Sequence, residues 1–99
     1  MENIINISGA TYEAFAQSLA SKLSKKYYLC DSISVVERDM EFTLSFAVVA
    51  HYSKSMDEET YGREILSDIT PVWWDFEAIE GGMKFITDFS FDELKTYIL

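Results

Sequence analysis

The side chains best suited to covalent or metal chemistry are scarce in this sequence. The 99 residues include one cysteine, Cys30, and one histidine, His51. A thiol and an imidazole can form a nucleophile and its base, but neither residue lies in a flanking motif that signals this role. We interpret Cys30 as a small buried hydrophobic residue and His51 as a solvated side chain near a strand end. A structural zinc site ordinarily needs four nitrogen or sulfur ligands, so no zinc site is predicted.

The glycines carry no nucleotide-binding signal. The spacing of Gly9, Gly62, Gly81 and Gly82 fits neither the dinucleotide-binding fingerprint nor the phosphate-binding P-loop. The sequence therefore predicts no cofactor and no catalytic residue, and it favours a protein that is not an enzyme.

Carboxylates are the abundant chemical group. The chain carries 17 acidic and 8 basic residues, a formal net charge of −9. The segment 57–93 holds most of the acidic excess, with Arg63 and Lys84 as its bases. Such a field repels phosphate, so direct nucleic-acid binding is not predicted. The carboxylates can form a solvated surface, bind a cation, or imitate nucleic-acid phosphates toward a basic partner.

An amphipathic helix is predicted over residues 11–28. Apolar residues recur there at three- and four-residue spacing, with polar residues between them. Thr11 is the predicted N-cap, and Lys25 and Lys26 suit the negative end of the helix dipole. The apolar stripe, which is expected to face a sheet, consists of Tyr12, Phe15, Ala16, Leu19, Ala20, Leu23 and Tyr27.

Two alternating runs, 33–36 and 42–52, predict a first β-hairpin. An even-numbered loop between them keeps both apolar sets on one face of the sheet. The predicted register places Val35 opposite Leu44 and Ile33 opposite Phe46.

A second hairpin is predicted over 72–90, with Gly81-Gly82 as a two-residue turn. This turn brings three pairs together into one strongly apolar face, which we assign to the core. The pairs are Ala78 with Phe85, Phe76 with Thr87, and Trp74 with Phe89.

Short elements are predicted at both ends of the chain. Residues 4–7 can form a brief strand. Ser90 opens a capping box with Glu93, which predicts a short C-terminal helix with Leu94, Tyr97 and Ile98 on its apolar side.

The segment 53–71 is predicted to contain a short helix. Tyr61, Ile65 and Ile69 are four residues apart, and Asp57 can cap the first turn. A strand that runs into the Trp73-Trp74 segment is the alternative.

Together these elements predict a single α+β domain over residues 1–99. Its antiparallel sheet has about four strands, contributed by the two hairpins, and the N-terminal and C-terminal helices pack on one face. One cysteine cannot form an internal disulfide, and neither an export signal nor a long apolar span is present. A cytoplasmic location without membrane contact is therefore expected.

The sheet face opposite the helices is the candidate partner-binding surface. Trp73 is predicted to project from this face while Trp74 enters the core, because neighbouring strand residues point to opposite sides. Exposed apolar residues around Trp73 can bind a protein partner or a second copy of the chain. The candidate residues are Trp73, Val49, Ile79 and Ile86.

An acidic cluster is predicted on the same face. The second hairpin places Asp75 directly opposite Asp88, with Glu77 as a diagonal neighbour. Like charges directly opposite each other are unfavourable by about 0.2 to 1 kcal/mol. Lys84, opposite Ile79, is expected to neutralise only part of this charge. Replacing Asp88 by Asn is therefore expected to stabilise the isolated protein modestly at low salt and to weaken the binding of a cationic partner.

The function predicted from these features is that of a small non-catalytic interaction or accessory protein. It would act through the acidic hairpin and the mixed apolar sheet face. One alternative is an acidic inhibitor that imitates nucleic acid toward a basic protein, which needs carboxylates spaced along a ridge. The other is a carboxylate-dependent enzyme with a divalent cation, which needs acids that converge in a concave pocket.

Overall fold

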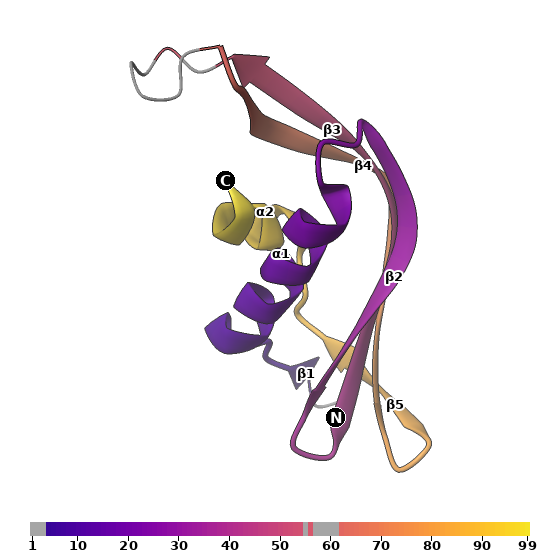
Figure 1. The fold of residues 1–99 in the computed structure, drawn as a ribbon. Helices are drawn as coiled ribbons and strands as arrows, with labels where there is room; N and C mark the ends of the chain where they lie inside the picture. The colour runs from indigo at the N-terminus through magenta and orange to yellow at the C-terminus, as the bar shows by residue number, and fades with distance from the viewer. Residues whose placement is uncertain (1–3, 55, 57–61) are drawn as a thin grey trace.

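The computed structural model describes residues 4–54, 56 and 62–99, and it has the α+β fold that the sequence predicts. Both helices lie on one side of a curved sheet (Figure 1). The sheet has five strands in the order β1-β5-β4-β3-β2, and it is mixed rather than purely antiparallel because β1 pairs in parallel with β5. The elements are β1 (Ile4–Ile5), α1 (Gly9–Leu23), β2 (Tyr28–Glu37), β3 (Met40–Lys54), β4 (Glu64–Glu80), β5 (Met83–Thr87) and α2 (Phe91–Ile98).

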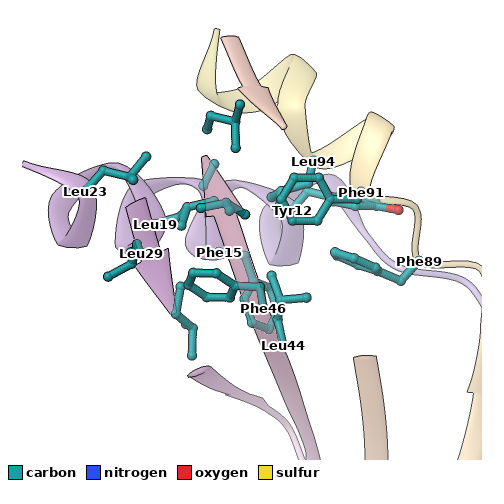
Figure 2. Packing of buried hydrophobic residues seen from close by; sticks show 14 of the residues in the cluster. Tyr12, Phe15, Leu19, Leu23, Leu29, Leu44, Phe46, Phe89, Phe91 and Leu94 are labelled. Atoms are coloured by element: carbon teal, nitrogen blue, oxygen red, sulfur yellow. The ribbon is translucent and has the colours of Figure 1, made fainter. Parts of the chain in front are cut away.

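The core lies between the two helices and the sheet side that faces them (Figure 2). Five residues of the predicted stripe are buried here and meet the alternating apolar residues of β3: Tyr12, Phe15, Ala16, Leu19 and Leu23. The assignment of Ala20 and Tyr27 to the stripe was wrong, because Ala20 is exposed and Tyr27, 59% exposed, follows the end of the helix. Fully burying a large aliphatic or aromatic side chain contributes about 1.5 to 3 kcal/mol, so this layer is the main source of stability. The largest fully buried residues are Phe15, Leu19, Leu23, Leu44, Phe46, Val48, Ile69 and Leu94.

Helix α1 begins earlier than predicted. Its N-cap is Ser8, whose Oγ accepts the Thr11 N–H at 3.2 Å, so the assignment of Thr11 as the cap was wrong. Thr11 is instead buried, and its hydroxyl donates to the carboxylate of Glu37. This bond places an anion beside the positive end of α1 and ties the helix to the β2–β3 turn.

Helix α1 also ends earlier than the predicted residue 28. Ser24 and Lys25 adopt left-handed backbone conformations with φ of 32° and 69°, which terminate the helix after Leu23. The chain then reverses, and Tyr28 begins β2.

The first hairpin forms with a register that differs from the prediction by two residues. Val35 lies opposite Phe42, and Ile33 lies opposite Leu44. The reason is the turn, which contains just Arg38 and Asp39, with Arg38 at a left-handed φ of 58°. A shift of two residues leaves every side chain on its predicted face.

The Gly81-Gly82 turn and the predicted pair of Ala78 with Phe85 are confirmed. The ladder between β4 and β5 ends at this pair, because β5 then turns to pair with β1. The aromatic residues of the predicted apolar face still meet, and the rings of Phe76 and Phe89 stack at 4.0 Å. The ring of Trp74 lies 5.4 Å from that of Phe89 but is 40% exposed, so Trp74 borders the core rather than entering it.

The predicted helix in 53–71 was wrong, and the strand alternative is observed from Glu64 onward as part of β4. The proposed cap and first turn, 57–61, lie outside the described residues. Two β-bulges interrupt the pairing of β4 with β3, and they leave Ser67 and Val72 without a partner on β3. Bulges bend a strand, and β3 and β4 curve together along the molecule, whose longest dimension is 53 Å (Figure 1).

Helix α2 completes the helical layer. Ser90 caps it as predicted, with Oγ accepting the Glu93 N–H at 3.4 Å. The reciprocal half of the predicted capping box does not form, because the Ser90 N–H donates to Tyr12 Oη at 3.1 Å. Lys95 Nζ reaches Asp68 Oδ1 of β4 at 2.7 Å and so fixes the helix to the sheet. Within the described ranges, neither helix is long and apolar enough to cross a membrane.

The position of Leu19 predicts a large effect of truncation. Leu19→Ala is expected to lower the free energy of unfolding by about 2 to 5 kcal/mol, because the residue is 0% exposed and its loss leaves a cavity. Gln17→Ala on the exposed side of α1 is the control and should change stability by less than about 0.5 kcal/mol. Urea denaturation measures both, and a loss below about 1 kcal/mol for Leu19→Ala would contradict this packing.

The contact between Asp68 and Lys95 predicts sensitivity to acid. The hydrogen bond from Lys95, followed by that from the Ile69 N–H, holds the pKa of Asp68 below its usual 3.8. The carboxylate therefore stabilises the folded state above about pH 4, and this contribution is lost as the pH falls through the folded-state pKa. Asp68→Asn should lower the urea midpoint at neutral pH and have little effect at the acid end. Asp39→Asn in the exposed turn is the control, and a deficit for Asp68→Asn that stays constant with pH would argue against the contact.

Candidate functional site

Side chains that point away from α1 and α2 form a surface that we call the helix-free face. The antiparallel register aligns these side chains in rows that run across β2, β3 and β4. Two neighbouring rows at the middle of the sheet are Cys30, Ala47 and Trp73, and then Tyr28, Val49 and Thr70.

The bulge at Val72 decides which residues of β4 join this face. Trp73 and Thr70 both lie there, because the unpaired Val72 shifts the alternation by one residue. Ile69 therefore points to the opposite side, where it is fully buried in the core.

Five side chains of the two rows form an apolar band. Tyr28 is 57% exposed and Trp73 is 49% exposed, which are large fractions for aromatic residues. Ala47 is 1% exposed because Cys30 and Trp73 flank it on both sides. The apolar band, as defined here, consists of Tyr28, Cys30, Ala47, Val49 and Trp73.

A polar band lies beside the apolar band, toward the two hairpin turns. Its rows are Ser32, Ser45 and Asp75, and then Ser34, Thr43 and Glu77. The hydroxyls of Ser34 and Thr43 are hydrogen-bonded at 3.1 Å. The helix-free face therefore combines an apolar area with an adjacent area of hydroxyls and carboxylates.

The four predicted partner-binding residues do not form one patch. Trp73 and Val49 lie together in the apolar band. Ile79 is six residues from Trp73 along β4, or about 20 Å at about 3.3 Å per residue, and it is half-buried. Ile86 is exposed beside Ile4, its partner on β1. Trp73 and Val49 are thus the members of the predicted set that share one surface.

The predicted acidic cluster forms in part. Asp75 and Glu77 lie in the polar band, but Asp88 does not lie opposite Asp75, because the pairing of β4 with β5 ends at Phe85. The carboxylate of Asp88 instead accepts the Ile7 N–H at 2.7 Å. The predicted opposition of Asp75 and Asp88 was therefore wrong, and Asp88 holds the segment that connects β1 to α1.

Lys84 neutralises this area more directly than predicted. Its Nζ lies 2.9 Å from Glu77 Oε1. The hydrogen bond to Glu77, with the charges of Glu77 and Asp75, raises the pKa of Lys84 above its usual value. Asp75 is left as the carboxylate of the polar band nearest to the apolar band.

Cys30 and His51 do not form a pair, and the interpretation of Cys30 as buried was wrong. Cys30 is exposed in the apolar band opposite Ala47. His51 lies four residues from Ala47 along β3, or about 13 Å away, and its Nε2 is 2.8 Å from Thr70 Oγ1. In the described part of the chain, no three side chains of the metal-ligating types converge on one point.

A hollow of about 260 Å³ lies between the segment before α1 and the β2–β3 turn. It is smaller than the roughly 300 to 1,000 Å³ of typical ligand pockets. Its wall includes Ser8, Thr11 and Glu37, whose polar atoms are already engaged in capping α1 and in the Thr11–Glu37 bond. The polar groups of this hollow therefore stabilise the fold, and we do not assign the hollow a ligand.

Sequence reasoning missed Tyr28 and Cys30 as members of the candidate site, because Tyr28 was assigned to the predicted helix 11–28 and Cys30 was interpreted as a buried residue. The alternation of Leu29, Asp31 and Ile33 with their neighbours is the signal that extends the strand back to Tyr28. This alternation is weak because Asp31 stands in the middle of the core-facing set.

Comparison with known proteins finds no relative: the chain matches no family model, no curated protein and no solved structure. What can be proposed about function rests on the chemistry of the helix-free face.

The new role of Asp88 reverses the stability effect expected from the sequence. Asp88→Ala should destabilise the protein by about 0.5 to 1.5 kcal/mol, because the Ile7 N–H loses its acceptor. Glu80→Ala, at an exposed position beside the Gly81-Gly82 turn, is a control for the loss of one negative charge. A rise in the urea midpoint for Asp88→Ala at low salt would instead support repulsion from neighbouring carboxylates.

Proposed function

We propose that this chain is a small non-catalytic interaction protein that binds a protein partner through the helix-free face. The observation that carries the proposal is the apolar band. Both helices cover the other side of the sheet, so Tyr28 and Trp73 keep about half of their surface in water. Exposed apolar groups that lie together, next to polar ones, are typical of sites where proteins bind each other.

The composition of the face indicates the chemistry of the partner. Aromatic side chains are frequent at the energetic centre of protein interfaces, and Trp73 and Tyr28 can fill that role. Asp75 lies in the row next to Trp73 and provides an acceptor for a lysine or arginine. The partner expected from this arrangement presents an apolar group beside a basic one. The net charge of −9 would speed its approach and make binding sensitive to salt.

The backbone beneath the apolar band is suited to this role. Ala47 and Val49 lie on β3, which is paired on both sides, with β2 and with β4. The opposite face of β3 is packed in the core, where Phe46 and Val48 are fully buried. A surface held in this way loses little freedom on binding, which favours affinity.

Trp73→Ala is the test of the proposal. It should weaken binding of the partner about tenfold to thirtyfold, because aromatic hot-spot residues contribute about 1.4 to 2 kcal/mol or more. Ile65→Ala is the matched control, since Ile65 is 48% exposed near the start of β4, outside the apolar band. Affinity capture from the source cells would supply the partner, and titration with the purified partner would measure each dissociation constant.

Two outcomes of this titration would contradict the proposal. Equal binding by wild type, Trp73→Ala and Ile65→Ala would remove the helix-free face from the interaction. A loss on Asp75→Asn with no loss on Trp73→Ala would favour recognition by charge alone, as in the acidic inhibitor.

A further inference from the structure

Strand β2 forms an open edge of the sheet. It is the last strand in the order, and it pairs with β3 along its full length of 10 residues. No other described element runs along its outer side, as Figure 1 shows. A long, regular strand with unpaired backbone groups is a template for pairing with a further strand.

Every second residue of β2 presents its backbone groups to this outer side. The Tyr27 carbonyl accepts the Ala50 N–H at 2.9 Å, so the odd-numbered residues direct their N–H and C=O groups toward β3. The even-numbered residues therefore direct their backbone N–H and C=O groups away from β3, toward the outer side. One of these groups, the Ser32 N–H, donates to Asp31 Oδ1 at 2.7 Å. The outward residues are Tyr28, Cys30, Ser32, Ser34 and Val36.

The other free edges in the described structure are poorly suited to pairing. β1 has two residues, and the parts of β3 and β5 that extend beyond their outer neighbours are short, 51–54 and 83–85. The stretch of β4 that β5 leaves unpaired contains Pro71 and the bulges at Ser67 and Val72, and Asp68 Oδ1 caps the Ile69 N–H at 2.8 Å. Prolines and bulges are common means of preventing edge association.

We propose that β2 pairs with β2 of a second copy of this chain, antiparallel and around a two-fold axis, to form a dimer with one continuous sheet. The charges at the ends of the strand favour this occupant. Lys25 and Lys26 precede β2, whereas Glu37, Arg38 and Asp39 lie at its far end, so the two ends carry net charges of +2 and −1. Antiparallel self-pairing brings the basic end of each strand beside the acidic end of the other.

The geometry also closes the assembly at two copies. A two-fold axis uses the same edge of both chains, and the remaining edges are the interrupted and short ones just described. The dimer is therefore complete, and a filament is not expected.

The register of the dimer follows from the outward residues and the charges. With Ser32 opposite Ser32 of the second copy, Cys30 faces Ser34 and Tyr28 faces Val36, so all outward residues are paired. Shifts that place Asp31 opposite Asp31 or Glu37 of the second copy bring like charges together. In the favoured register Asp31 releases the Ser32 N–H and keeps its contact with Lys22 Nζ at 3.0 Å.

The dimer goes beyond the proposed function, because it uses the sheet edge and leaves the helix-free face open. It would join two apolar bands on one side of a continuous sheet. Trp73 lies on β4, two strands from the edge, so its replacement should not affect dimerisation.

Oxidative cross-linking of Ser34→Cys tests the register. The two thiols within one chain of this variant would be about 13 Å apart along β2 and cannot bridge, whereas facing residues in the dimer would have Cα atoms about 5.5 Å apart, within disulfide range. A covalent dimer is expected for Ser34→Cys under mild oxidation. Ser45→Cys is the matched control, since it lies in the row of Ser32 but on the central strand β3. No covalent dimer, or equal cross-linking of both variants, would overturn the proposed register.

Sedimentation velocity across a concentration series tests the dimer itself. Ser34→Pro removes an outward N–H without breaking a backbone hydrogen bond to β3, although it also removes the exposed hydroxyl contact with Thr43. It should raise the dimer dissociation constant at least tenfold. If the proline variant fails to fold, Ser32→Lys replaces it, with Ser45→Lys as its control. Ser32→Lys places the lysines of the two copies opposite each other at the two-fold axis, and their repulsion should weaken the dimer. The proposal is overturned if the wild type stays monomeric. It is also overturned if Trp73→Ala abolishes the dimer while both edge variants leave the dimer intact. If a variant loses partner binding but keeps the dimer, the result tests the proposed function of the helix-free face and leaves the dimer proposal unaffected.

Discussion

The fold depends on the burial of one face of β3 beneath α1. Leu44, Phe46 and Val48 of this strand are fully buried, and they meet the stripe of α1 that contains Phe15 and Leu19. β3 also carries β2 and β4 on its two sides, so the central backbone pairing and the main apolar layer share one strand. Since α2 joins α1 on the same side, no element of the described chain is left to cover the other side (Figure 1). The apolar band is exposed as a direct result of this one-sided packing.

A second constraint arises from the unequal lengths of β4 and β5. β4 has 17 residues and β5 has 5, and β5 also turns away to hold β1. Aromatic stacking replaces the missing ladder, because Phe89 follows β5 and packs on Phe76 and Trp74. The cost is an unpaired stretch of β4, which Pro71 and the two bulges protect from association.

Many of the acidic side chains have local structural partners, which gives the acidic composition a role in the fold. Asp31 and Asp68 each accept the N–H of the next residue on a free strand edge, and each also contacts a lysine of a helix. Glu37 bonds to Thr11 at the start of α1, and Asp88 bonds to the N–H of Ile7. The carboxylate that remains near the apolar band is Asp75, so recognition of a basic group would be concentrated there.

The sequence by itself determined the features that depend on neighbouring residues. The stripe of α1, the alternation of β3, the register at Gly81-Gly82 and the cap at Ser90 follow from periodicity and turn chemistry within a few positions. The tertiary structure decided what depends on distant partners: the pairing of β1 with β5, the edge position of β2, the bond from Ile7 to Asp88, and the exposure of Cys30. It also decided that Ile65 and Ile69 belong to a strand, since their four-residue spacing suits a helix and the bulge at Ser67 places them on opposite faces of β4. Spacing along the chain reports which side chains can share a face, whereas burial on that face is set by which strand lies alongside and which helix lies above.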